Sequence, residues 1–321
     1  MRLLKRPSIG EAFGIGLAVS FVGIALWLQL TGAGGAKDFA VYMRTTQGDY
    51  LDFYYGYWIV PLFSLLGLLP PPLDYAVWMI INLAGLWFAA RVFGGRPGLV
   101  LCSYPAFFML YWGQISGLLL GSLALCWWAL LHRKWVWAGL GLILACSKYQ
   151  VGVPLSLILL FCAGVPWKQL PKIALIPTAA VLLSLIIYPL WPIQILERFA
   201  AHPPVSDWSI TLWRLAGPAS LLLWIPPLVL PMPRHQRMLA LVATTCLAQP
   251  YFLMGDLMAL FIFPVEAIAL ASWLGAYPYF RANAQFVILG IIPGAVYLRL
   301  LLPALASLLK RKLAPEPHLP G

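Results

Sequence analysis

The side chains that could do chemistry in this sequence are few, and they stand at the ends of apolar stretches. Asp38 comes directly after the first apolar run, where a membrane helix would meet water. A charge at that depth is costly and usually has a task, although capping a juxtamembrane helix is the simpler alternative. Gln114 begins one later apolar run and Lys148 ends another. Together, an ammonium and a carboxamide near the bilayer surface could hold a lipid phosphate, but each could equally be structural.

The composition places these residues in a membrane protein. Of 321 residues, 62% are hydrophobic and 10% are charged, and the mean hydropathy is +0.86. A soluble domain carries about 25% charged residues, and no water-soluble core could bury this much apolar surface. The apolar runs are long and do not alternate with polar residues, which excludes a β-barrel. The sequence therefore predicts an all-α polytopic membrane protein, with residues 1–321 forming a single integral membrane domain.

The net charge of +11 does not indicate a nucleic-acid partner. Most basic residues lie in short loops between apolar runs, where they set the orientation of the chain. No basic surface with interleaved aromatic residues, which nucleic acid would need, is visible. The five cysteines lie inside apolar runs without CxxC spacing, so they are interpreted as small packing residues.

Cytoplasmic loops are enriched in Lys and Arg, and this rule sets the predicted topology. With the basic start of the chain in the cytoplasm, the sequence predicts about eleven crossings (ten to twelve). Two polar loops, residues 33–74 and 192–216, then face outward. The predicted spans are residues 11–32, 75–91, 97–112, 115–131, 135–147, 151–165, 173–191, 217–231, 238–250, 257–274 and 285–303.

Two segments decide whether this topology holds. Residues 58–69 are apolar but end at three prolines and are shorter than the roughly 20 residues that a span needs. We interpret them as a re-entrant or interfacial helix; if they crossed, Asp38 and Lys148 would lie on opposite sides. The last span places Lys310-Arg311-Lys312 outside, against the charge rule, which points to a misassigned span near the C-terminus.

Acidic and basic side chains gather on the predicted outer face, whereas the inner loops are almost purely basic. This distribution suggests a site on the outer face, although outer loops that merely avoid positive charge would also look mixed. The aromatic residues of the first outer loop suit stacking on sugar rings, and interfacial anchoring explains them about equally. The further candidates for ligand contacts are Tyr42, Asp49, Asp52, Tyr54, Arg198, His202, Arg214 and Asp256.

Several catalytic patterns are absent from the sequence. The four histidines form no cluster with cysteine or carboxylate at metal-site spacing. Neither a GxSxG motif nor a Walker loop occurs. Zinc chemistry, serine hydrolysis and ATP use are therefore unsupported, and no metal is required, although Asp49 and Asp52 could bind one.

The order of several motifs is familiar. An acid after the first helix, a short apolar segment ending in prolines, and a span closing with ARVFG at residues 90–94 resemble the GT-C superfamily of membrane glycosyltransferases. The succession GQISGLLLG (113–121), WAGLGL (137–142) and SKYQ (147–150) resembles glycosyltransferase family 87. That family includes α-mannosyltransferases that depend on polyprenol-phosphate-mannose. The resemblance covers roughly residues 11–165.

This resemblance implies a GT-C-like bundle with juxtamembrane helices in the first outer loop. It implies that Asp38 is the general base and that Lys148 and Gln114 match the family's lysine and glutamine, which we expect to bind the donor phosphate. Arg198 or Arg214, in the second outer loop, is a further candidate for that phosphate. The implied partners are a polyprenyl-phosphate sugar, most simply of mannose, a glycolipid or glycan acceptor, and membrane lipids, with no cofactor.

The site would face the periplasm or exterior from the cell (inner) membrane. A lipid transporter or flippase and a non-catalytic GT-C homologue remain alternatives. A transporter would favour paired broken helices in matching halves of the chain, and the sequence has no such symmetry.

Overall fold

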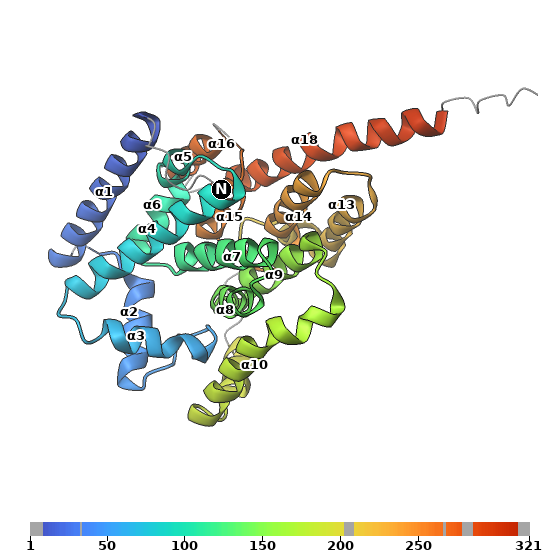
Figure 1. Ribbon diagram of the computed structural model, residues 1–321. Coiled ribbons are helices and arrows are strands. Elements are labelled where there is room, and N and C mark those ends of the chain that lie inside the picture. Colours follow the sequence, from blue (N-terminus) through green and yellow to red (C-terminus); the bar gives the residue numbers. More distant parts are fainter. Residues whose placement is uncertain (1–8, 33, 202–208, 266–267, 278–284, 314–321) are drawn as a thin grey trace, which may run out of the picture.

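The computed structural model describes residues 9–32, 34–201, 209–265, 268–277 and 285–313, which form helices joined by turns (Figure 1). This confirms the predicted all-α architecture. Within these residues, extended segments pair only in one isolated antiparallel bridge, between Ser209 and Leu253. The helices are α1 (Ile9–Leu30), α2 (Lys37–Arg44), η1 (Thr45–Gln47), η2 (Tyr57–Ile59), α3 (Val60–Leu66), α4 (Leu73–Phe93), α5 (Pro97–Leu101), α6 (Tyr104–Trp112), α7 (Ser116–Leu131), α8 (Trp135–Ala145), α9 (Tyr149–Ala163), η3 (Trp167–Gln169), α10 (Leu170–Ile187), α11 (Trp191–Ala201), α12 (Trp213–Ala216), η5 (Gly217–Trp224), α13 (Ile225–Val229), α14 (Arg234–Ala248), η6 (Met254–Leu257), α15 (Met258–Phe261), α16 (Ile268–Ala271), η7 (Ser272–Ala276) and α18 (Gln285–Leu313).

Four helices in the described residues are long and apolar enough to cross a membrane, namely α1, α4, Trp167–Ile187 and Leu289–Leu309. The pair α6 and α7 adds a fifth if the two count as one span, and it bends by 115° at the break. The predicted number of about eleven spans is not confirmed.

Short interruptions that average hydropathy does not detect explain much of the difference. The predicted span 97–112 is split into α5 and α6, because the Ser103 hydroxyl accepts a hydrogen bond from the Ala106 amide and caps α6. The predicted span 217–231 is a 3-10 helix, η5, followed by the short helix α13.

The first outer loop contains the predicted short helices. It folds as α2, η1, η2 and α3, and the helical stretch Tyr57–Leu66 is about 15 Å long at 1.5 Å per residue. A hydrocarbon core is about 30 Å thick. The stretch is therefore too short to span, as predicted for residues 58–69.

The two ends of the bundle differ in charge. At one end, Arg91 of α4 pairs with Glu11 of α1 at 3.1 Å, and the guanidinium of Arg234 of α14 lies 5.0 Å from the ring centre of Trp127. We call this the basic end. The opposite end holds Asp38, Gln114, Lys148 and Asp256, and we call it the site end.

Helix α18 packs against α14. Near its start, a Cβ atom on Gly290 would lie 2.7 Å from the carbonyl oxygen of Ile210, which belongs to the second polar loop. Farther along, Arg299 lines a cavity together with Gln236, which is in the first turn of α14 at the basic end. The helix is therefore antiparallel to α14.

The prediction that residues 285–303 run outward was wrong. Residues 257–274 do not make the single crossing that was predicted. The chain reaches the basic end at Ile262, whose carbonyl accepts a hydrogen bond from the Gly95 amide at 3.0 Å, and continues as the short helices α16 and η7. Helix α18 then runs toward the basic end.

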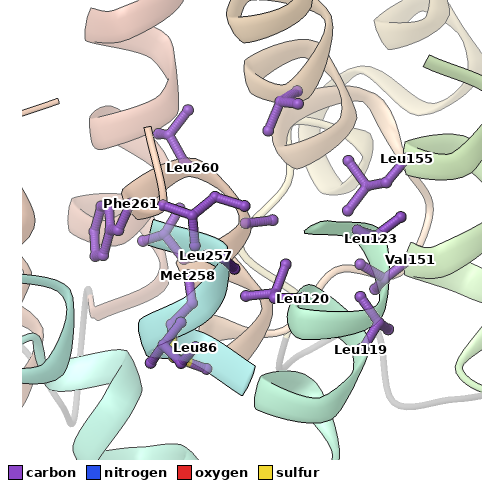
Figure 2. Close-up of a cluster of buried hydrophobic side chains, with 14 of the residues drawn as sticks. Leu86, Leu119, Leu120, Leu123, Val151, Leu155, Leu257, Met258, Leu260 and Phe261 are labelled. Atoms are coloured by element: carbon purple, nitrogen blue, oxygen red, sulfur yellow. The ribbon is translucent and has the colours of Figure 1, made fainter. Parts of the chain in front are cut away.

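One hydrophobic cluster joins the helices that carry the site (Figure 2). Leu119 comes from α7, Val151 from α9 and Leu257 from η6, and all three are buried. Each of them follows a polar site residue by at most three positions: Ser116, Lys148 and Asp256, respectively. Burial of this cluster therefore fixes the backbone on which those side chains stand.

Close packing between α4 and α7 predicts a position that cannot accept a methyl group. A Cβ atom on Gly121 of α7 would lie 2.6 Å from the Cα of Gly85 of α4, so one of the two helices would have to move. We expect Gly121→Ala to lower the free energy of unfolding by about 1–3 kcal/mol, the usual cost of overpacking, measured by denaturant unfolding in detergent. Gly23→Ala on α1 is the matched control, because nothing lies within 4 Å of its Cβ position. Equal stability of both variants would contradict this packing.

Candidate active site

Asp38 lies in the first turn of α2, and the backbone fixes where that helix begins. Ala36, the residue before α2, has φ +54°. Its amide donates a hydrogen bond to the carbonyl of Tyr111, near the end of α6, at 2.7 Å. Phe39 is buried, and its ring centre lies 5.1 Å from that of Tyr75 of α4. Helix α2 is thus attached to both α4 and α6, and Asp38 is held beside the α6–α7 bend.

Gln114 lies at that bend. Gly113 before it has φ +72°, and a Cβ there would lie 2.7 Å from the Cβ of Phe39, so both conformation and space require glycine. The indole nitrogen of Trp78 donates to the Gly113 carbonyl at 2.7 Å and fixes the turn. The buried Gln114 side chain then makes a hydrogen bond with Asp38.

The Oε1 atom of Gln114 faces the backbone of Gly255. A Cβ on Gly255 would overlap this oxygen, so the two segments touch only because residue 255 has no side chain. Among the described residues, Oε1 has no hydrogen-bond partner. A buried acceptor without a partner is costly, and it is available to a donor group of a ligand.

Lys148 and Asp256 form a buried ion pair. The ammonium Nζ lies 2.6 Å from Oδ1 of Asp256, and the side chains are 4% and 1% exposed. The Ser116 hydroxyl donates to the same Oδ1 at 3.1 Å, and the Leu253 amide donates to Oδ2 at 3.2 Å. Asp256 is therefore bound by three donors that come from three separate parts of the chain.

The charges of this cluster act on Asp38. Burial removes water from the Asp38 carboxyl and raises its pKa above the usual value, and this is the largest effect. The hydrogen bond from Gln114 and the positive charge of Lys148 lower the pKa, whereas the negative charge of Asp256 raises it. The balance is a raised pKa, which suits a carboxylate that must accept a proton.

The aromatic candidates differ in their surroundings. Tyr42 is fully buried, and its hydroxyl donates to that of Tyr55 at 3.0 Å, so it is a core residue under the site. Tyr54 is partly exposed, and its ring centre lies 5.2 Å from that of Phe199. The Phe199 ring is in turn 6.2 Å from that of Tyr149, which follows Lys148. Tyr54 therefore lies on the side of the site where Lys148 enters.

The structure gives several other candidates a different environment. Arg198 donates to the carbonyls of Tyr50 and Phe53 and to the hydroxyl of Tyr57, so it fastens the first outer loop to α11. Arg214 is exposed on α12. His202 lies outside the described residues. Arg198 is therefore occupied by the first outer loop and is not part of the cluster around Asp38.

Asp49 and Asp52 also lie away from the cluster. Both pair with Arg44, at 3.5 Å and 2.7 Å, and all three side chains are exposed. In the described parts of the chain, no three His, Cys, Asp or Glu side chains gather closely enough to hold a metal ion.

Sequence reasoning missed Ser116 and Gly255. Ser116 stands in the stretch that follows Gln114, so its position two residues from a candidate was an available signal. Gly255 allows its own segment to approach Gln114, which is distant in the sequence, and no local sequence pattern predicts such a contact.

The match to a known family decides the class of this protein. The sequence model of glycosyltransferase family 87 matches residues 53–277. The chain belongs to glycosyltransferase family 87. Its apolar helices and this membership identify a membrane glycosyltransferase.

The matched region of this family 87 protein includes Gln114, Lys148 and Asp256 and begins after Asp38. No curated protein and no solved structure matches the chain significantly.

Proposed function

We propose that this family 87 enzyme transfers a sugar, most simply mannose, from a polyprenyl-phosphate donor to a hydroxyl of a glycolipid or glycan. The observation that carries the proposal is the cluster at the site end. A carboxyl with a raised pKa, Asp38, lies with a buried amide, Gln114, and a buried ammonium, Lys148. One group could accept a proton while the others bind a phosphate.

The proposed reaction is a single displacement at the anomeric carbon. The acceptor oxygen attacks this carbon, and Asp38 takes the hydroxyl proton as the new C–O bond forms. The bond between the anomeric carbon and the phosphate oxygen breaks, and the electron pair leaves with polyprenyl phosphate. The anomeric centre is inverted, and the leaving phosphate gains one negative charge.

Lys148 and Gln114 would stabilise that charge. An ammonium has three N–H donors, and the described structure uses one of them for Asp256. The remaining donors would bind a phosphate without giving up the ion pair. A fixed cation and amide aimed at developing charge are the usual means of stabilising a transition state.

We propose that the site end faces the periplasm or exterior of the cell (inner) membrane. The support is the distribution of charge: the opposite end carries Arg91 and Arg234. Basic loops are retained in the cytoplasm. The donor lipid would then lie in the outer leaflet with its phosphate at the interface.

Purified protein incubated with radiolabelled polyprenyl-phosphate mannose and membrane glycolipids tests the proposal. We expect free polyprenyl phosphate to be released only when acceptor is present, together with a labelled glycolipid. Movement of the labelled lipid between leaflets without bond cleavage would support a transporter instead. Neither release nor movement would support a non-catalytic family member.

The hydrogen bond from Gln114 predicts a pH effect. This bond lowers the pKa of Asp38, so Gln114→Leu should raise it further. Because the base acts deprotonated, kcat/KM rises with pH through this pKa, and the acid limb should move to higher pH in the variant. A full pH–rate profile measures it. Gln169→Leu is the control, since Gln169 also has a buried Oε1 without a partner in the described structure but lies in η3 and does not contribute to the pKa of Asp38. The same shift of the acid limb in both variants would contradict the role of the Gln114 hydrogen bond.

A further inference from the structure

The ion pair between Lys148 and Asp256 joins two segments that are far apart in the sequence, and both side chains are buried. Lys148 ends the turn between α8 and α9, and Asp256 lies in η6, 108 residues later. Removing two charges from water is expensive unless each finds strong partners. The 2.6 Å contact and the additional donors from Ser116 and Leu253 supply them.

We infer that Asp256 is a positioning residue that holds the Lys148 ammonium for the phosphate of a polyprenyl-phosphate donor and itself never touches that donor. This inference rests on the proposed function. Asp256 was predicted from the sequence as a contact for sugar or acceptor. Its side chain is 1% exposed, and both of its oxygens already accept hydrogen bonds, so no free oxygen faces a sugar.

The surroundings of Asp256 make it a rigid support. The hydrogen bond from the Leu253 amide to the Asp256 carboxylate closes the first turn of η6. Leu257 and Met258, which follow it, lie in the cluster of buried side chains shown in Figure 2. A carboxylate fixed in this way can keep a flexible four-carbon side chain such as Lys148 in a single position.

The same carboxylate also acts on the base. Asp38 lies close enough to Asp256 for the negative charge of Asp256 to raise its pKa, while Lys148 lowers it. A residue that served folding alone would have no reason to influence both donor binding and the titration of the base. The donor KM is therefore the readout that separates positioning from a purely structural role, and the acid limb of the pH–rate profile reports the loss of the charge itself.

The decisive variant is Asp256→Asn, studied in the full-length enzyme with polyprenyl-phosphate mannose as the donor. We expect the KM for the donor to rise about tenfold to a hundredfold, since a hydrogen bond to a charged group is lost, while kcat changes less. The acid limb of the pH–rate profile should move to lower pH, because the negative charge that raises the pKa of Asp38 is gone. This shift is opposite to the one expected for Gln114→Leu.

A matched control neutralises a carboxylate in another ion pair. Glu11→Gln alters the pair with Arg91 at the basic end, and we expect the donor KM and the acid limb to stay as in the wild type. If Asp256→Asn does not fold, Asp256→Glu keeps the charge and displaces the ammonium by one methylene, and it should still raise the donor KM.

Two kinds of failure can be told apart. A wild-type protein that releases no polyprenyl phosphate with any acceptor would overturn the proposed function. An active wild type together with a folded Asp256→Asn variant that keeps the donor KM would overturn the positioning role alone. In the fallback arm, an unchanged donor KM for Asp256→Glu would overturn it as well.

Discussion

Asp38→Asn should reduce sugar transfer by at least about 10²–10⁴-fold, the usual contribution of a general base, and leave donor binding intact. The amide is nearly isosteric but cannot accept the hydroxyl proton. Asp38 makes its side-chain contact with Gln114 and is anchored through the backbone of α2, so the variant should fold. Release of polyprenyl phosphate from labelled donor measures the rate, and equilibrium binding of unlabelled donor measures affinity.

Asp74→Asn is the matched control for this experiment. Asp74 also lies at the site end, in the first turn of α4, where its carboxylate accepts a hydrogen bond from the Tyr75 amide. Neutralising Asp74 removes a favourable negative charge from the N-terminus of α4, which should lower the free energy of unfolding by at most about 0.3–1 kcal/mol. The rate of sugar transfer should stay near that of the wild type. A native rate in Asp38→Asn would show that Asp38 is structural and would remove the proposed base.

Lys148→Met should raise the donor KM, as Asp256→Asn does, and because the ammonium itself is lost it should also lower kcat by about 10²–10³-fold, as loss of one group aimed at developing charge does. It should also destabilise the protein by about 3–5 kcal/mol, because Asp256 is left buried without its cation. Initial rates and denaturant unfolding in detergent give the two quantities separately.

The double variant Lys148→Met with Asp256→Asn separates those two effects. With both charges removed, most of the lost stability should return, since replacing a buried ion pair as a whole is often neutral. Asn keeps an oxygen for the Leu253 amide. Transfer should stay low, because no ammonium faces the phosphate. Recovery of transfer along with stability would show that Lys148 serves folding only.

The sequence was most informative where a residue type alone carries a cost. Asp38, Gln114 and Lys148 stood out as polar groups at the ends of apolar runs, and the structure brings the three together. Residues 58–69 were also predicted correctly as too short to cross the membrane, because that follows from their length alone. These inferences rest on local properties that hydropathy and charge express directly.

Other features depend on contacts between distant segments. Asp256 was predicted as a ligand contact because it falls on the predicted outer face, yet it is buried against Lys148, 108 residues away. Arg198 was a candidate for phosphate binding but fastens the first outer loop through two carbonyls and a hydroxyl. The predicted direction of α18 was wrong because residues 257–274 are mostly apolar, and average hydropathy does not reveal a chain that turns within such a stretch.

The cluster shown in Figure 2 has a consequence for how this enzyme loses activity. The residues that carry Ser116, Lys148 and Asp256 are continuous with Leu119, Val151 and Leu257, which pack against one another in the interior. The backbone segments that carry the charged pair should therefore loosen only when this buried cluster does. Heating or harsh detergent should inactivate the protein in the same cooperative step in which its tertiary structure is lost, with no folded, inactive state between them.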